Sequence, residues 1–459
     1  THPIFDPSSE SSYAVGSDGG PSSSSTGCNI LPAVSSQYGR GRVNFGQTAF
    51  AYAPPKGFKP WCTANIPQTG AVRPNEYFDV VTWAGDGGTK DITGLKFKPD
   101  MTWVKVRDFA TTHSMQNSVL GAGLNTTLRP DTSNALDTNG NLYGYTSSFN
   151  TSGFTVVNGS SGGHRVNASG YNYVAWCWKA GGDKDTFNID DVGYSTAAAA
   201  GMDGGDITPT ACSVGTKQGF SIIKYSGNST NNQTISHGLG RVPTMVWVKN
   251  ITEDNYWNNK SCANSSQDVA YLNAAEHEGP ATGSQHGIVD DFSSSTTVNL
   301  KTNATNYLNV NESGDDYIMY VWTDIPGLQK FGGYTGNGAK KFVYLGFRPA
   351  LIILKRIVAN SSPDTSDGYT SWTMVDTQRL SYNGKTPNHL FANLNVAEGY
   401  RGNGTATSNL GDMTVEPMSN GFYLNGPGSE VNASTGSYIY CAWAEAPFQN
   451  LYGAQSNAR

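Results

Sequence analysis

Three segments of this 459-residue chain share one pattern of apolar runs, and this internal repetition is the strongest constraint on its fold. Each segment opens with a run that leads into a Gly-Asp or Gly-Asn turn able to take positive φ, in residues 78–87, 220–229 and 331–338. Each then places a Pro six residues before a Lys: Lys105, Lys249 and Lys355. Each closes with an aromatic run, in residues 173–178, 317–322 and 438–443. The shared order predicts three diverged copies of one module.

The repeated runs have the length and punctuation of β-strands. They are short, rich in aromatic and β-branched residues, and separated by Gly, Asn and Pro. In each closing run the Tyr and the final Trp are five residues apart, which places them on opposite faces of a strand. Aromatic residues make up 11% of the chain, so burial is expected in place of disorder. We predict an all-β fold of tandem antiparallel β-sandwich modules, jelly-roll or lectin-like in type.

The spacing of the blocks sets the expected domain boundaries. Residues 1–68 form a loop-rich N-terminal segment, and the three modules occupy 69–182, 218–326 and 327–459. Residues 183–217 read as a linker with one helical turn. Because the second and third copies follow each other closely, we expect them to form a tight pair and the first copy to be looser. The third copy has a longer interval between its Pro and closing Tyr, which indicates a loop insertion.

Composition argues against several classes of partner. The net charge is −6 and Lys and Arg are scattered singly, so no basic stripe is present for nucleic acid. No apolar run approaches the roughly 18 residues of a membrane span. The six cysteines show no CxxC spacing, which argues against a disulfide scaffold or a zinc site. Cys177 and Cys441 lie inside apolar runs and are expected to pack as buried free thiols.

Signals of catalysis are weak. No GxSxG motif occurs, and the seven histidines do not recur between copies or adopt metal-ligand spacing. The acidic pairs at 190–191, 290–291 and 315–316 are sequence neighbours, whose side chains point to opposite faces of a strand. We therefore expect no enzyme activity, no cofactor and no metal. A polysaccharide depolymerase stays open as an alternative, because loops can bring distant carboxylates together.

Aromatic residues in long loops are the candidate binding residues. Rings exposed in loops of the second and third copies can stack on sugars, and the candidates are Trp257, Tyr271, Tyr369, Trp372 and Tyr382. The alternative for each ring is ordinary packing beneath a loop. The three recurrent lysines lie at strand ends and are expected to be solvated caps that oppose edge pairing.

Two parts of the chain resemble proteins of tailed phages. Residues 42–47, 50–52, 54–59 and 62–67 resemble the C-terminal end of SPRY-type domains in virion proteins. The motifs YTGNG at 334–338 and GFRPA at 346–350, with the ending at 444–448 and 456–459, resemble repeat modules in structural proteins of marine and cyanobacterial phages.

This resemblance implies a virion structural protein and no catalytic residues. The expected role is a tail fibre or appendage on the particle surface, assembled as a homo-oligomer such as a trimer. Its expected partners are other virion proteins and a host surface glycan or receptor. The alternatives are a capsid decoration or tail scaffold protein without a receptor and, third, the depolymerase.

Overall fold

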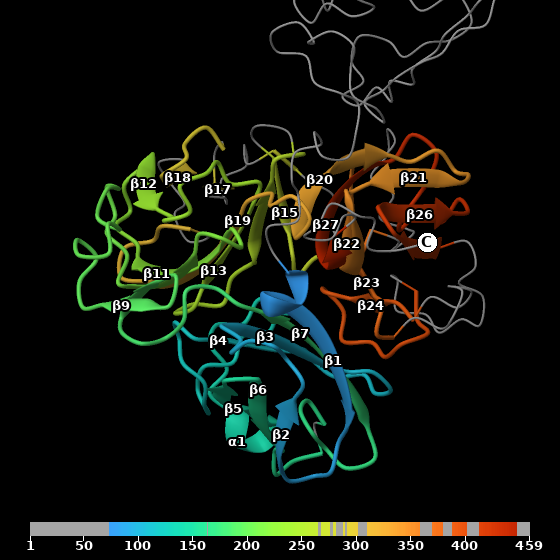
Figure 1. Ribbon diagram of the computed structural model, residues 1–459, viewed down its shortest axis with the longest axis horizontal. Coiled ribbons are helices and arrows are strands. Elements are labelled where there is room, and N and C mark those ends of the chain that lie inside the picture. The colour runs from blue at the N-terminus through green and yellow to red at the C-terminus, as the bar shows by residue number, and fades with distance from the viewer. Residues whose placement is uncertain are drawn as a thin grey trace, which may run out of the picture. The chain divides into compact units, whose positions relative to one another are not determined.

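The computed structural model describes residues 73–447 except 163, 265–267, 276–278, 281–287, 290–291, 302–309, 359–369, 380–387 and 402–412. These residues belong to one compact unit. The described chain is all-β (Figure 1), with helical turns at η2 (Pro74–Glu76) and α1 (Gly140–Tyr143). The predicted all-β fold of antiparallel β-sandwich modules is confirmed.

The first module is a sandwich of two antiparallel sheets. Its main sheet has the order β1-β7-β3-β4, and its outer sheet has the order β2-β6-β5. Ile92 and Phe154 of the outer sheet pack against Val104 and Tyr173 of the main sheet. The bounds are β1 (Phe78–Ala84), β2 (Thr89–Thr93), β3 (Met101–Val106), β4 (Ser114–Asn117), β5 (Tyr145–Asn150), β6 (Gly153–Val157) and β7 (Asn172–Trp178).

The second and third modules repeat this strand order. The second has β11-β19-β13-β14 extended by β15 and β16, over an outer sheet β12-β18-β17. Its bounds are β11 (Phe220–Ser226), β12 (Gln233–Ser236), β13 (Met245–Asn250), β14 (Asn258–Ser261), β15 (Asp268–Tyr271), β16 (Gly279–Pro280), β17 (Ile288–Val289), β18 (Thr297–Lys301) and β19 (Asp316–Trp322).

In the third module the main sheet is β20-β27-β22-β23-β24 and the outer sheet is β21-β26-β25. The bounds are β20 (Gln329–Thr335), β21 (Lys341–Tyr344), β22 (Phe347–Val358), β23 (Thr373–Asp376), β24 (Leu390–Phe391), β25 (Thr414–Met418), β26 (Gly421–Asn425) and β27 (Ser437–Pro447). In each module the closing strand therefore lies between the first strand and the strand that carries the recurrent Lys.

Residues 183–217, expected to be a linker, contribute to the second module. They hold β8 (Phe187–Ile189), β9 (Val192–Tyr194) and β10 (Ala211–Gly215). Strand β10 pairs antiparallel with β11 and parallel with β8, which brings the main sheet of the second module to nine strands. Cys212 and Val214 enter the core of that module. Short strands of this kind lack the apolar length that marks the repeated runs.

The closing strands are buried on both faces. In β7, Tyr173, Ala175 and Cys177 face the core of their own module, whereas Trp176 and Trp178 face a second core. The predicted placement of the Tyr and the final Trp on opposite faces is thus confirmed. A strand covered on both sides reads as a continuous apolar run, which explains the sequence of all three closing strands.

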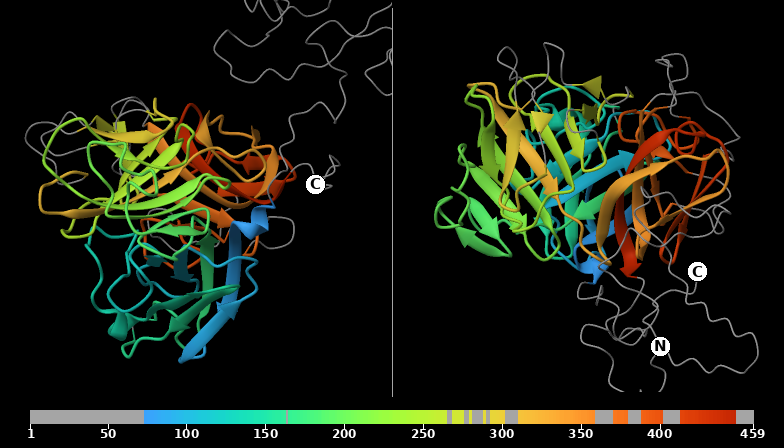
Figure 2. Two further views of the ribbon diagram at one scale, coloured as in Figure 1. Left: turned by 60° about the vertical axis from the view of Figure 1, so that its left-hand side comes forward. Right: turned by 90° about the horizontal axis from the view of Figure 1, so that it is seen from above.

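The second faces of the three main sheets share one core. Residues of all three modules contribute to it, and the modules lie side by side in Figures 1 and 2. The Trp443 ring centroid lies 5.4 Å from that of Trp178 and 6.1 Å from that of Trp322. Trp103 of the first module lies 6.1 Å from Trp247 of the second. The expectation of a looser first copy is wrong, because the second face of its main sheet shares one core with the other two copies.

Contacts between the modules form a closed cycle. The residue before the fourth strand of each module bonds a backbone carbonyl of another module. Trp257 Nε1 of module two donates to Arg129 O of module one at 3.1 Å. Trp372 Nε1 of module three donates to Tyr271 O of module two at 2.7 Å. His113 Nδ1 accepts from Trp103 Nε1, so its Nε2–H faces Leu394 O of module three at 3.0 Å. The three modules therefore form a head-to-tail ring within one chain.

A glycine directly follows the first strand of each module, because another backbone segment passes close to it. A Cβ on Gly85, Gly227 or Gly336 would lie 2.1–2.2 Å from a backbone carbonyl oxygen before the closing strand. None of these three glycines has positive φ; the left-handed residues come two positions later, at Gly87, Ser229 and Gly338. The recurrent Gly is thus required by space, and not by φ as the turn pattern suggested.

A buried Asn holds the same turn in every module. Asn432 Oδ1 accepts from the Asn337 backbone N–H at 3.1 Å, and its Nδ2 donates to Gly426 O at 3.0 Å. Asn311 repeats this arrangement, accepting from the Asn228 N–H at 2.9 Å. The equivalent motifs read V-N-x-S, at 166–169, 310–313 and 431–434, at one constant distance before the closing Tyr. This fourth repeated block was missed at the level of sequence.

Candidate functional site

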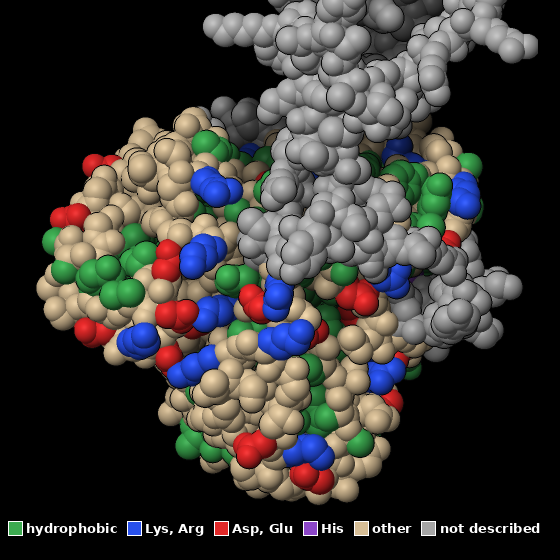
Figure 3. Space-filling view, in the orientation of Figure 1, with side chains coloured by type: hydrophobic (Ala, Val, Ile, Leu, Met, Phe, Trp, Pro, Cys, Tyr) green, Lys and Arg blue, Asp and Glu red, His purple; other side chains and the backbone are tan. Residues whose placement is uncertain are grey.

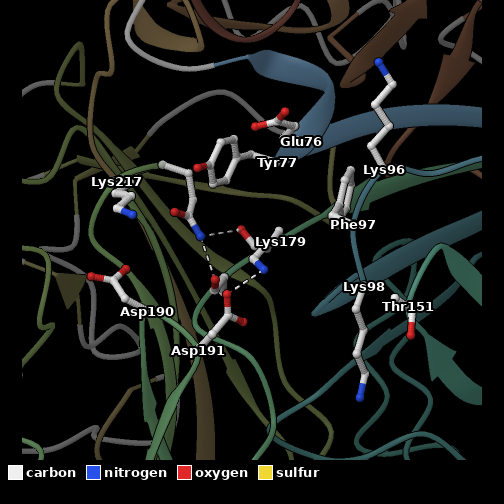
Figure 4. A pocket seen from close by; sticks show the side chains of 12 residues that line it. Glu76, Tyr77, Lys96, Phe97, Lys98, Thr151, Lys179, Asp190, Asp191 and Lys217 are labelled. Carbon is white, nitrogen blue, oxygen red and sulfur yellow. Dashed lines mark hydrogen bonds and ion pairs between the residues drawn. The ribbon is translucent and has the colours of Figure 1, made fainter.

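A groove of about 500 Å³ lies beside the start of β1 and is the first candidate site. Its wall carries both charges, with four lysines and three carboxylates: Lys96, Lys98, Lys179, Lys217, Glu76, Asp190 and Asp191. Figure 4 shows Lys96 and Lys98 extending in opposite directions, so these cations do not converge on one point.

Most of the charges in this groove are engaged by the fold. Lys179 Nζ contacts Asp191 Oδ2 at 2.7 Å, as Figure 4 shows. Asp190 accepts from the backbone N–H and the hydroxyl of Thr216 at 2.8 and 2.5 Å. Asp190 and Asp191 both have left-handed backbone, with φ of 49° and 66°, so the tight turn between β8 and β9 depends on these contacts. The groove is a preformed polar surface, and two of its three carboxylates already have structural partners.

The predicted glycan-binding aromatics are not available for stacking where the structure describes them. Trp257 and Trp372 are fully buried, and Tyr271 is 8% exposed. Both Trp rings donate to backbone carbonyls of the adjoining module. The proposed stacking role is therefore wrong for Trp257 and Trp372, because the contact between modules covers them. The Tyr271 ring is also buried, and it packs against Tyr256 of its own module with centroids 4.7 Å apart. Tyr369 and Tyr382 lie outside the described residues.

The three recurrent lysines are buried, which overturns their expected role as solvated strand caps. Lys249 Nζ donates to Asn250 O at 2.6 Å and to Ser133 O of the first module at 3.1 Å. Lys355 Nζ donates to Ala275 O of the second module at 2.8 Å. Lys105 Nζ donates to Val106 O at 2.8 Å. Two of the three ammonium groups thus tie adjoining modules together through backbone carbonyls.

Burial of these lysines predicts a pH-dependent stability. Desolvation lowers the pKa of Lys105 and Lys249 to about 7 in the folded chain. In the unfolded chain their pKa is near 10.4, so above pH 7 the unfolded state binds more protons and the free energy of unfolding rises with pH. We expect a gain on the order of 1–2 kcal/mol per lysine between pH 7 and 8.5. Above about pH 9 the trend is opposed, because burial raises the pKa of Cys212 to about 11.

Urea denaturation at pH 7.0 and 8.5 measures this gain. The variant Lys105→Met/Lys249→Met should lose most of the dependence, whereas Lys90→Met, at a partly exposed lysine paired with Asp86, should retain it. A free energy of unfolding that stays flat or falls over this interval in the unmodified chain would contradict the prediction.

Other chemistry-bearing groups serve the fold where they are described. No cluster of three or more His, Cys, Asp or Glu suited to a metal ion occurs among the described residues. Cys177 and Cys441 are buried free thiols, as predicted, and Cys212 and Cys262 are also free. In the same part of the chain, no helix has the length and apolarity needed to cross a membrane.

Among the described residues, Phe109 and Tyr256 are exposed aromatics in loops, whereas Phe342 and Tyr344 are exposed on a strand. Phe342 and Tyr344 project outward from β21, and Tyr423 lies opposite Phe342 on β26. The alternating run Lys341-Phe342-Val343-Tyr344 carries the signal, because its single buried residue is Val343. These rings were not among the predicted binding residues, since all of those were placed in loops.

A family model with the description "Domain of unknown function (DUF7483)" matches residues 73–447. The chain belongs to this family. The DUF7483 match spans all three modules and the strands between the first two, which belong to one compact unit. No curated protein and no solved structure matches the chain. Residues 42–67, for which a SPRY-type end was predicted, precede the DUF7483 region and lie outside the described residues.

Proposed function

We propose that this DUF7483 protein is a structural protein of a tailed-phage particle, a tail fibre or appendage component that contacts glycans on the host surface. The observation that carries the proposal is the closed ring of three modules around a shared aromatic core. Each main sheet is buried on both faces, so the outer sheets and their loops form the surface of the ring. A rigid ring whose outer sheets differ in sequence suits a protein on a particle surface. The resemblance of the repeats to phage structural proteins supports the same role.

The burial of Trp257 and Trp372 favours a second candidate, a capsid decoration or tail scaffold protein without a receptor. Both rings were expected to meet sugars, and both stabilise contacts between modules instead. The two candidates differ in where the protein sits on the particle.

Immunogold electron microscopy of intact particles, with antibody raised against residues 218–459, tests the proposal. We expect label on thin appendages or at the tail tip. Label spread over the capsid shell would reject the tail-fibre role and support a capsid decoration protein. Particles that carry no label, from a stock in which the protein is detected by mass spectrometry, would end the virion assignment.

Oligomerisation stays part of the proposal. Because one chain already supplies three modules in a ring, three-fold geometry does not require three chains. A fibre assembled from several copies should show a solution mass that is a multiple of 48.9 kDa, measured by light scattering. A single-chain mass in solution would count heavily against the fibre.

The depolymerase alternative would require an active site. The groove lined by Glu76, Asp190 and Asp191 is the candidate for it. We expect no release of reducing ends when the protein is incubated with host polysaccharide. Release that is abolished by Glu76→Gln, in a variant with unchanged melting temperature, would replace the structural proposal by an enzyme.

A further inference from the structure

The outer sheet of the third module carries exposed aromatic rings on its solvent face. Phe342 is 37% exposed and Tyr344 is 56% exposed, although the Val343 between them is buried. Tyr423 lies directly opposite Phe342 in the β21–β26 register, with ring centroids 5.0 Å apart. Figure 3 shows hydrophobic side chains with basic side chains beside them over this region. We call the set Phe342, Tyr344 and Tyr423 the aromatic face.

The other two modules show that the fold does not need these rings. The inward residue of the equivalent strand is Ile92 in module one and Ile235 in module two, each packed in its module core as Val343 is. The cross-strand pair equivalent to Phe342 and Tyr423 is polar in both: Asp91 with Thr155, and Thr234 with Asn299. The position of Tyr344 is taken by Thr93 and Ser236. The aromatic face is therefore specific to the third module, and packing within the sandwich does not account for it.

Lysines border the aromatic face. Lys340 Nζ lies 4.3 Å from the centroid of the Tyr423 ring, and Lys330 Nζ lies 5.5 Å from that of Tyr344. Lys341 also lies on β21, but alternation along the strand places it on the same face as the buried Val343. Two acidic residues lie nearby. Glu416 of β25 pairs with Tyr423 of β26, and Glu445 forms an ion pair with Arg348 at 2.8 Å. Lys330, Lys340 and Arg348 outnumber the two glutamates, so the surface is complementary to a ligand with flat apolar faces and negative charge.

We propose that the aromatic face binds an acidic glycan. Sugar rings would lie against Phe342 and Tyr344, and their carboxylate groups would contact Lys330 and Lys340. Pyranose faces present C–H groups to aromatic rings, and uronic acids add the negative charge that the lysines attract. The groove beside β1 fits such a ligand less well, because Lys98 and Lys179 are already paired with carboxylates. This inference rests on the proposed function and names the class of glycan that the particle would meet.

The test replaces residues of the aromatic face by those found at the equivalent positions of another module. The variant Phe342→Thr/Tyr344→Ser/Tyr423→Asn places the residues of module two on the aromatic face. A second variant, Lys330→Ala/Lys340→Ala, removes the flanking charge. Phe109→Thr is the matched control, because Phe109 of the first module is also 37% exposed. Each full-length protein is applied to an array of alginate, polygalacturonate and hyaluronate, with dextran and laminarin as neutral probes, and the affinities are then measured by titration calorimetry.

We expect the unmodified chain and Phe109→Thr to bind at least one acidic probe and neither neutral one. The aromatic-face variant should bind at least tenfold more weakly with an unchanged melting temperature, and the lysine variant should lose most of the salt dependence. Undiminished binding by the aromatic-face variant, equal binding of neutral probes, or no binding of any acidic probe would overturn the inference. Self-association of the unmodified chain that the same variant abolishes would assign the face to a second copy instead.

These outcomes are independent of the particle labelling. Label on appendages without acidic-glycan binding would reject this site and keep the proposed function. Glycan binding through the aromatic face by a protein that labels no particle would keep the site and reject the virion role.

Discussion

Trp443→Ala should destabilise the whole three-module ring by about 3–5 kcal/mol. The Trp443 side chain is fully buried, and its ring contacts aromatic rings of every module. Its partners are Phe331 in its own module, Phe78 and Trp178 in the first, and Trp322 in the second. Truncation to Ala leaves a cavity at the point where the three sheets meet, and closing it would require all three modules to shift.

A double-mutant cycle separates this shared core from the cores of the single modules. Trp178→Ala and Trp443→Ala should be non-additive in the free energy of unfolding, with a coupling above about 0.5 kcal/mol, because the two rings touch. The matched pair is Phe154→Ala with Phe422→Ala, which are equivalent buried residues in two separate module cores. Their effects should add. Additive effects for the tryptophan pair, measured by chemical denaturation, would show that the shared core contributes little coupling.

Asn432→Leu should cost about 2–4 kcal/mol, since it keeps the approximate volume and removes the hydrogen bonds of a buried amide. The substitution leaves the Asn337 N–H and the Gly426 carbonyl without the partner that the side chain supplies. An unpaired buried polar group loses its solvation without compensation. The same loss is expected for Asn311→Leu in the second module, where the amide bonds the Asn228 N–H and Thr230 O.

The control for Asn432→Leu lies in the same motif. Ser434 is exposed, and Ser434→Ala should change the free energy of unfolding by less than about 0.5 kcal/mol. Hydrogen exchange at the Asn337 amide gives a local readout, which should become faster in Asn432→Leu only. Unchanged exchange together with unchanged stability would show that this turn does not depend on the amide.

The repeats carried enough information to predict the fold class. Alternation in the closing strands placed Tyr173 and Trp178 on opposite faces, and the structure confirms this because a strand has a strict two-residue period. The same strands are apolar on both faces, which is typical of strands with a second partner layer. In this chain the second layer comes from the other modules, so a continuous apolar run marks each strand that takes part in the shared core.

The predicted binding residues were mostly wrong, because burial of their side chains depends on residues far away in the sequence. Trp257 and Lys249 lie near the ends of strands, where a sequence pattern does not distinguish solvent from the carbonyls of another module. Each is buried by residues more than a hundred positions away. The exposed rings on β21 were accessible to prediction, because alternation marks Phe342 and Tyr344 as outward-facing. Only the comparison with Asp91 and Thr234 shows that the fold does not require them.

A ring made from one chain has a consequence for valency. In a trimer of identical chains every surface occurs three times, so one substitution changes three sites and weak contacts add up to strong avidity. Here each module has its own sequence, so each outer sheet can change alone while the other two keep the ring intact. The aromatic face on β21 and β26 accordingly occurs once per chain. Under the proposed role, strong attachment through this face would depend on how many copies one particle carries.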